Sequence, residues 1–148
     1  MAITYNKQTR EFHLQTNRSS YIFTILENEQ LGHLYYGKKI RHKDSFQHLL
    51  ETGLRGNINY LKEGDMNFSL EQTKQEYPSY GTTDYREPAF QILQENGSRI
   101  TNFQYKKHDI YKGKPKLEGL PATYAEKNDR IDTVEITLYD EVIDTELV

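Results

Sequence analysis

Apolar and polar residues alternate with a period of two over much of the chain. Phe12 and Leu14 alternate with polar neighbours in residues 11–15, which predicts a strand with one buried face. Residues 20–26 are dense in β-branched and aromatic side chains, and residues 31–36 resume the pattern after a polar break. Together these segments predict a β-meander.

A second strand pair is predicted around an Asn-Gly turn. Residues 89–95 lead into Asn96-Gly97, the residue pair that best tolerates the positive φ angles of a type I′ turn, and residues 98–105 return. Because the turn chemistry and the flanking alternation agree, we expect a β-hairpin here. Residues 106–112 are expected to extend it after a bend.

The C-terminal part has the same two-residue period. Residues 133–138 alternate cleanly, with three aliphatic side chains on one face. We expect residues 139–141 to turn the chain and residues 142–148 to begin another strand, in which the sequence stops. An unpaired sheet edge at that strand would favour association between copies of the chain.

Residues 38–87 differ in texture, because glycines are scattered among polar residues with little strand alternation. Residues 44–50 carry a capping Asp and then apolar residues at helical spacing, and residues 69–72 match a capping box. The predicted fold is therefore all-β and antiparallel, a sandwich with one or two short helices in the 38–87 excursion.

The composition indicates one folded domain. The chain has 148 residues, with 12 Tyr and 6 Phe that supply large apolar surfaces. A net charge of −3 without long runs of one sign argues against nucleic acid and membrane surfaces as partners. The absence of cysteine excludes disulfides and thiol chemistry, and no apolar segment follows the start of the chain, so we expect a cytoplasmic protein.

Candidate chemical groups are sparse in this sequence. No two of the five histidines have metal-ligand spacing, so neither a metal nor another cofactor is predicted. Carboxylates near the C-terminus fall at turns and outward faces, where solvated positions are the rule. Gly113-Lys114-Pro115-Lys116 lacks the rest of a phosphate-binding loop, and Pro115 removes one backbone donor. Tyrosines in residues 77–85 could stack on sugar rings or pack half-exposed on strands.

Two long blocks carry a resemblance to a known family. They are Glu76-Tyr77-Pro78-Ser79-Tyr80-Gly81-Thr82-Thr83-Asp84-Tyr85-Arg86 and Gly113-Lys114-Pro115-Lys116-Leu117-Glu118-Gly119-Leu120-Pro121-Ala122-Thr123-Tyr124. With similarity along essentially the whole chain, the sequence resembles the N-terminal region of bacterial α-galactosidases of glycoside hydrolase family 36. The resemblance implies that residues 1–148 are a truncated β-supersandwich segment, like that of galactose mutarotase, in a larger enzyme.

The resemblance also implies what this segment does. The parent enzyme would add a catalytic (β/α)8 barrel and a C-terminal β domain, and would hydrolyse terminal α-galactosyl residues of the melibiose and raffinose type with retention. Two Asp residues of the barrel act as nucleophile and acid/base in the family, so this chain is expected to hold no catalytic residue. Its expected roles are oligomerisation and shaping of the active-site mouth.

Family members are typically homotetramers in which an N-terminal loop, matching residues 46–68 here, reaches the active site of a neighbouring subunit. The sugar-contacting Asp of that loop matches Leu54, so the Asp is missing. The remaining candidates for substrate contact are Arg55, Glu51 and Asp65.

Two other functions remain open on the sequence. A stand-alone carbohydrate-binding β-sandwich would use the tyrosine clusters and bind galactosides by itself. A sugar epimerase or mutarotase would use the same supersandwich fold and accelerate anomerisation of galactose.

Overall fold

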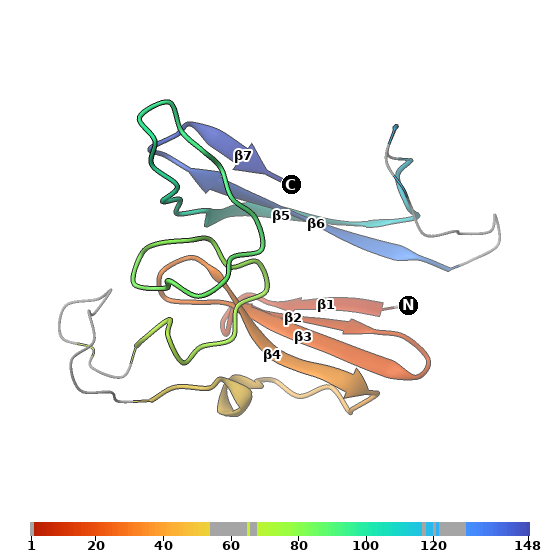
Figure 1. The fold of residues 1–148 in the computed structure, drawn as a ribbon. Coiled ribbons are helices and arrows are strands. Elements are labelled where there is room, and N and C mark those ends of the chain that lie inside the picture. Colours follow the sequence, from red (N-terminus) through yellow and green to blue (C-terminus); the bar gives the residue numbers. More distant parts are fainter. Residues whose placement is uncertain (1, 54–64, 66–67, 117, 120, 122–129) are drawn as a thin grey trace.

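Two antiparallel sheets face each other in the computed structural model, which describes residues 2–53, 65, 68–116, 118–119, 121 and 130–148 (Figure 1). The first sheet is a meander with the order β1-β2-β3-β4, formed by β1 (Ala2–Asn6), β2 (Glu11–Gln15), β3 (Ser19–Ile25) and β4 (Leu31–Lys38). The second has the order β5-β6-β7, formed by β5 (Gln104–Lys112), β6 (Asp132–Asp140) and β7 (Thr145–Leu147).

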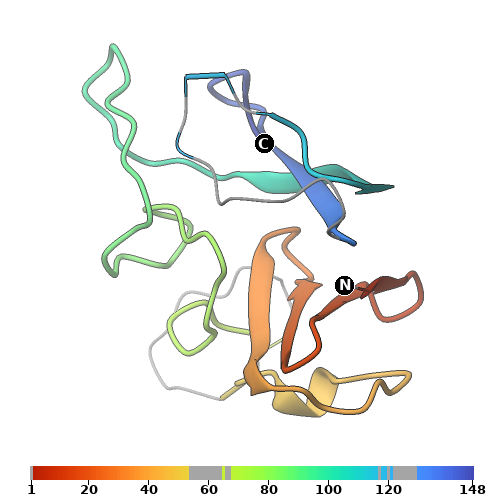
Figure 2. The ribbon, with the colours of Figure 1, turned by 90° about the vertical axis from the view of Figure 1, so that its right-hand side faces the viewer.

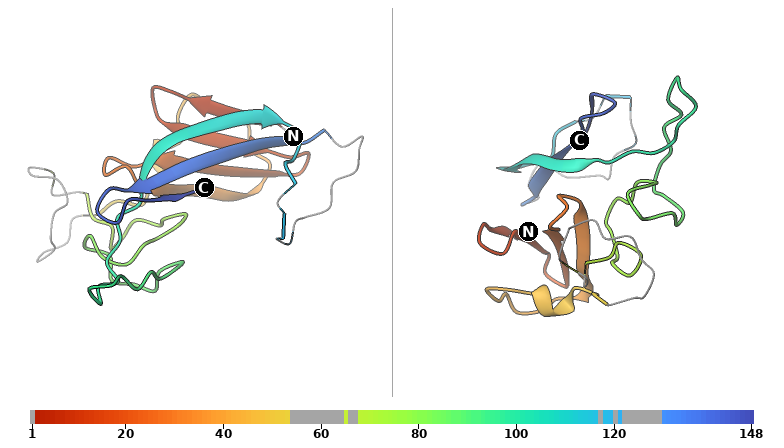
Figure 3. Two further views of the ribbon diagram at one scale, coloured as in Figure 1. Left: turned by 90° about the horizontal axis from the view of Figure 1, so that it is seen from above. Right: turned by 90° about the vertical axis from the view of Figure 1, so that its left-hand side faces the viewer.

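The meander predicted from the two-residue period is confirmed and is one strand longer. β1 pairs with β2 along its whole length, from Ala2 opposite Gln15 to Asn6 opposite Glu11. A bulge between Ile22 and Phe23 shifts the register of β3 against β4. In the second sheet β5 and β6 form a long ribbon that runs across the meander in the view from above (Figure 3).

The main core lies between the two sheets. Phe12, Phe23 and Ile25 are buried at its centre, and the Phe12 ring stacks on Phe23 with centroids 4.7 Å apart. Val134 and Ile136 pack against this centre from β6, as the alternation of residues 133–138 predicts. The edge of the Phe12 ring also meets the His108 ring of β5 at 4.8 Å, so one aromatic side chain contacts both sheets.

A third layer covers the opposite face of the meander (Figure 2). It is formed by residues 39–50, here called the strap, which cross beneath β2 and β3 and contain the single 3₁₀ turn η1 (Gln47–Leu49). Phe46 of the strap is buried against Ile22 and Leu34 of the meander. The face of the sheet that sequence patterning assigns to solvent is therefore covered.

Of the two short helices predicted within residues 38–87, the first is present as a short 3₁₀ helix and the second does not form in the described residues. Residues 44–50 form only the three-residue η1, and residues 69–72 form a turn. In that turn the Ser69 hydroxyl accepts a hydrogen bond from the Glu71 N–H at 3.3 Å, so the capping side chain closes a turn rather than a helix. No helix in the described part of the chain has the length and apolarity that crossing a membrane requires.

Of the predicted hairpin over residues 89–105, only the position of the turn is correct. Gly97 has a φ of +81° and the Gln94 N–H donates to the Ser98 carbonyl at 3.0 Å, but Asn96 lacks the positive φ that a type I′ turn requires. No strand forms between residues 89 and 103. Leu93 is 67% exposed and Ile100 53% exposed, so these apolar side chains of the two arms are not buried in a core. An isolated two-stranded hairpin is only marginally stable in water, which accounts for the missing strands.

The last turn also differs from expectation. β6 runs on through Asp140, the turn occupies residues 141–144, and β7 is only three residues long. Asp140 is 2% exposed and accepts backbone hydrogen bonds from Asn102 at 2.6 Å and from Val142 at 2.9 Å. This carboxylate therefore holds the turn in place.

Truncation of Phe12 should destabilise the whole sandwich, because its ring contacts both sheets. We expect Phe12→Ala to lower the free energy of unfolding by about 3–5 kcal/mol. Urea denaturation followed by circular dichroism measures the change. Leu93→Ala on the exposed arm is the control and should stay within about 0.5 kcal/mol. A similar loss in both variants would contradict the assignment of the core.

Candidate functional site

Within residues 38–87, the segment that the resemblance assigns to substrate contact has a closed base, and it is called the excursion from here on. It leaves the strap at Glu51 and returns at Phe68, and the Thr73 hydroxyl donates to the Glu51 carbonyl at 3.2 Å. A Cβ atom on Gly53 would lie only 1.8 Å from the Gln72 side-chain oxygen, so the outgoing and returning segments are in close contact. Phe68 and Leu70 are buried beneath this point against Leu26, with Leu50 packed on them.

Two of the three predicted substrate contacts lie at this base. The exposed Glu51 places Oε1 2.7 Å from Lys74 Nζ, an ion pair that joins the two sides. Asp65 lines a hollow of about 280 Å³ with Thr52 and Phe68. Arg55, like Leu54, lies outside the described residues. The structure thus brings Glu51 and Asp65 to the ends of one excursion, and the sugar contact of all three stays a prediction.

The strap that leads into the excursion is held by the polar side chains of β2. The Glu11 carboxylate accepts hydrogen bonds from the Phe46 N–H at 2.9 Å and the Ser45 hydroxyl at 3.0 Å. Two residues on, His13 contacts the strap, and two further on Gln15 Nε2 donates to the Ile40 carbonyl at 3.1 Å. Every second residue of β2 therefore anchors the strap.

His13 is the middle anchor and is only 2% exposed. Its Nδ1 lies 3.0 Å from Nδ1 of His42 in the strap, and its Nε2 lies 3.0 Å from the Ser20 hydroxyl. The same hydroxyl accepts a hydrogen bond from the Ile40 N–H at 3.1 Å. Burial, and to a lesser extent the nearby His42, lowers the pKa of His13 from its ordinary value.

Glu76, which opens the first family block, ties residues 74–76 to the edge of β4. His33 Nδ1 lies 2.6 Å from one oxygen of Glu76, and the Tyr21 hydroxyl donates to the other. In the backbone, the His33 N–H donates a hydrogen bond to the Lys74 carbonyl at 2.8 Å. Burial and the bond to Glu76 strongly raise the pKa of Tyr21, so its hydroxyl keeps the proton that it donates.

Asp84 and Arg86, which close the same block, fasten it to the returning side of the excursion. Asp84 is 2% exposed and accepts hydrogen bonds at 2.8 Å from both Nε and Nη2 of Arg86. Arg86 Nη2 also donates to the carbonyls of Leu70 at 2.7 Å and Thr73 at 3.0 Å. Burial acts to raise the pKa of Asp84, but the hydrogen bonds and charge of Arg86 prevail and lower it.

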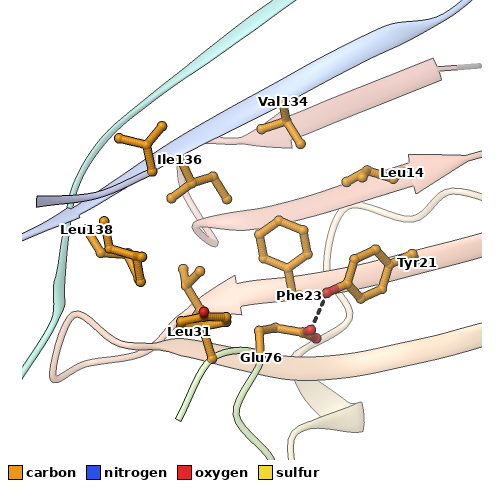
Figure 4. A pocket seen from close by; sticks show the side chains of 11 residues that line it. Leu14, Tyr21, Phe23, Leu31, Glu76, Val134, Ile136 and Leu138 are labelled. Atoms are coloured by element: carbon orange, nitrogen blue, oxygen red, sulfur yellow. Dashed lines mark hydrogen bonds between the residues drawn. The ribbon is translucent and has the colours of Figure 1, made fainter. Parts of the chain in front are cut away.

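An apolar cleft of about 360 Å³ opens between the sheets (Figure 4). Its walls are the aliphatic and aromatic side chains of the two inner faces, and Glu76 is the carboxylate among its described lining residues. Both oxygens of Glu76 are held, by His33 and Tyr21. A retaining glycosidase needs two carboxyl groups about 5 Å apart, and this cleft does not offer that pair. Within the described residues, no three His, Asp or Glu side chains are grouped to hold a metal ion.

Two facing antiparallel sheets, a covered outer face and an apolar cleft define a β-sandwich domain. Residues 29–148 match the Glycosyl hydrolase family 36 N-terminal domain, and the chain belongs to this family. It is 42% identical to alpha-galactosidase AgaA of Geobacillus stearothermophilus over 149 residues, which cover 99% of this chain and 20% of that protein.

Solved structures agree with this assignment. The alpha-galactosidase from Lactobacillus brevis superposes with a TM-score of 0.90 at 37% identity, over 97% of this chain and 19% of that chain. A variant of AgaA in complex with raffinose superposes with a TM-score of 0.82 at 42% identity, over 92% of this chain and 19% of that chain. The chain thus spans about a fifth of the length of the relatives that it matches.

Loss of the Asp84 charge should loosen the family block. We expect Asp84→Asn to lower the free energy of unfolding by about 2–4 kcal/mol at pH 7, because the Arg86 bonds lose their charged acceptor. Since the native pKa of Asp84 is lowered, its contribution is complete above the unfolded pKa of about 3.9 and disappears as the pH falls through the native value. The difference between the proteins should therefore shrink in acid.

Urea denaturation of both proteins between pH 7 and pH 3 measures this difference. Lys74→Ala is the control, because it breaks an ion pair whose side chains are both more than half exposed, and such pairs contribute at most about 1 kcal/mol. A pH-independent difference for Asp84→Asn would contradict the role of the carboxylate charge.

Proposed function

We propose that this chain is the non-catalytic N-terminal domain of an α-galactosidase that hydrolyses terminal α-galactosyl residues of oligosaccharides with retention. The observation that carries the proposal is 42% identity to alpha-galactosidase AgaA over 99% of this chain. The raffinose complex of an AgaA variant supports substrates of the raffinose type. The partner of the domain is the catalytic barrel of the same polypeptide, which supplies the nucleophile and the acid/base.

We assign the excursion between Glu51 and Asp65 to the mouth of the active site. Its closed base supports this role, because a loop that contacts substrate must be held by a rigid stem. The parent enzyme would assemble as a homo-oligomer, a homotetramer by the family pattern, so that the excursion reaches a neighbouring subunit. Size-exclusion chromatography with light scattering tests the assembly, and cell fractionation tests the cytoplasmic location.

A free carbohydrate-binding sandwich is a second candidate function, favoured by the exposure of Tyr85 at 62%. Its ring packs edge-on against Tyr80 with centroids 5.5 Å apart, which leaves Tyr85 open to a sugar face. Calorimetric titration of the chain with galactose and raffinose separates the two functions. Saturable binding would support the second, and a flat titration would exclude it.

The parent polypeptide should release galactose from melibiose and raffinose, whereas residues 1–148 alone should give the rate of buffer. The reason is that the two carboxyl groups of a retaining mechanism are expected in the barrel. An assay of released galactose on both proteins measures this. Activity of the isolated chain, or inactivity of the parent on every α-galactoside, would contradict the proposal.

Removal of a substrate contact from the excursion should weaken substrate binding without affecting the chemical step. In the parent enzyme we expect Glu51→Ala, Arg55→Ala or Asp65→Ala to raise KM for raffinose about tenfold, the effect of one lost charged hydrogen bond. The kcat value should stay within about twofold. Steady-state kinetics measure both parameters, with Lys107→Ala on β5 as control. Unchanged KM in all three variants would remove these residues from the site.

A further inference from the structure

The strap is attached to the meander through a pair of imidazoles. Nδ1 of His13 in β2 and Nδ1 of His42 in the strap are 3.0 Å apart, and the rings are inclined by only 28°. The Phe46 ring meets His13 edge-on at 5.2 Å and contacts His42 at 6.2 Å. Phe46 of the strap thus contacts both rings of the pair.

The number of protons decides whether this contact holds. With one proton on the two facing nitrogens, one ring donates and the other accepts. A further proton on His42 leaves the contact intact, because that ring then donates to His13. When His13 also takes a proton, two N–H groups face each other at 3.0 Å and the contact must break. The buried His13 is therefore the ring whose protonation matters.

The surroundings of His13 contain few other charges. Its partners in the sheet are Thr4 on β1 and Ile22 on β3, neither of which ionises. On its own strand Glu11 lies two residues away, with its carboxylate bound to Phe46 N–H and the Ser45 hydroxyl. On the strap, His48 stacks on the Phe46 ring with centroids 6.5 Å apart, and the backbone carbonyl of Asp44 accepts a hydrogen bond from the Asn6 side chain. Arg41 and Lys43 flank His42 and are exposed.

We propose that the His13–His42 pair is a proton-operated latch that fixes the strap and, through it, the base of the excursion. Released by acid, the strap loses its middle anchor between Glu11 and Gln15, so that the segment entering at Glu51 is no longer held in one position. His13 and His42 are thus positioning residues. The consequence for substrate binding rests on the function proposed above, whereas the latch itself does not.

Hydrogen exchange of the strap amides tests the latch in the chain itself. The N–H groups of Ile40 and Phe46 are bonded to Ser20 and Glu11, and we expect their protection, corrected for intrinsic exchange, to fall by up to about tenfold per pH unit below 6.5. Amides of the β2–β3 ladder should keep their protection. Constant protection of the strap down to pH 5 would overturn the proposal.

Two variants separate the pair from other titrations. In His42→Gln the side-chain amide can donate to a neutral His13 and can turn over to accept from a protonated one, so protection of the strap in acid should be retained. His48→Gln removes a histidine of the same strap outside the pair and should leave the acid response unchanged. A loss of the response in His48→Gln, or its persistence in His42→Gln, would each exclude the latch.

The parent enzyme gives the second readout. Between pH 7 and pH 5 we expect KM for raffinose to rise in the wild type more than in His42→Gln, with the ratio of kcat values between the two proteins constant. Equal KM profiles would overturn the link between latch and substrate. Absence of galactosidase activity in the parent would refute the proposed function alone, since the exchange experiment would still decide the latch.

Discussion

β2 is buried on both of its faces, and the rest of the structure depends on how the two faces are satisfied. Phe12 is fully buried on the side of the second sheet, while Glu11 and His13 are 4% and 2% exposed on the side of the strap. An apolar face needs only contact, but a buried carboxylate and imidazole need partners in fixed places. The backbone of the strap provides them, so the polar face of β2 sets the register of a segment that has almost no regular structure.

The same principle extends through the described part of residues 38–103. There the chain is held by the hydrogen bonds of polar side chains: Thr73 and Arg86 bond to backbone carbonyls, and Glu76 bonds to the side chains of His33 and Tyr21. This suits a sequence with only 35% hydrophobic residues, because a buried polar network can fix irregular backbone that a small core cannot. The excursion consequently starts and ends on a rigid base.

Sequence patterning predicted β2, β3, β4 and β6, but not β1 and not the layer that covers the meander. The alternation in residues 11–15 and 133–138 identifies β2 and β6, because a strand beside an apolar core repeats every two residues. It cannot reveal that Glu11, His13 and Gln15 are covered, since a polar residue bonded to a strap and a polar residue in water look alike in one sequence. The hairpin at Asn96-Gly97 failed for the opposite reason: a turn forms where local chemistry predicts one, but Leu93 and Ile100 beside it stay more than half exposed.

The resemblance that identified the family acquires a physical meaning from these contacts. Within the block from Glu76 to Arg86, Gly81 has a φ of +112°, and a Cβ atom there would lie 2.6 Å from the Ile100 side chain, so both backbone conformation and space require glycine. Glu76, Asp84 and Arg86 all bond through their polar atoms to backbone groups or to neighbouring side chains. The block is therefore a structural joint. Its similarity to relatives is explained more directly by the shared fold than by contact with a sugar. This joint and the strap both hold the base of the excursion, the segment that we propose to contact substrate.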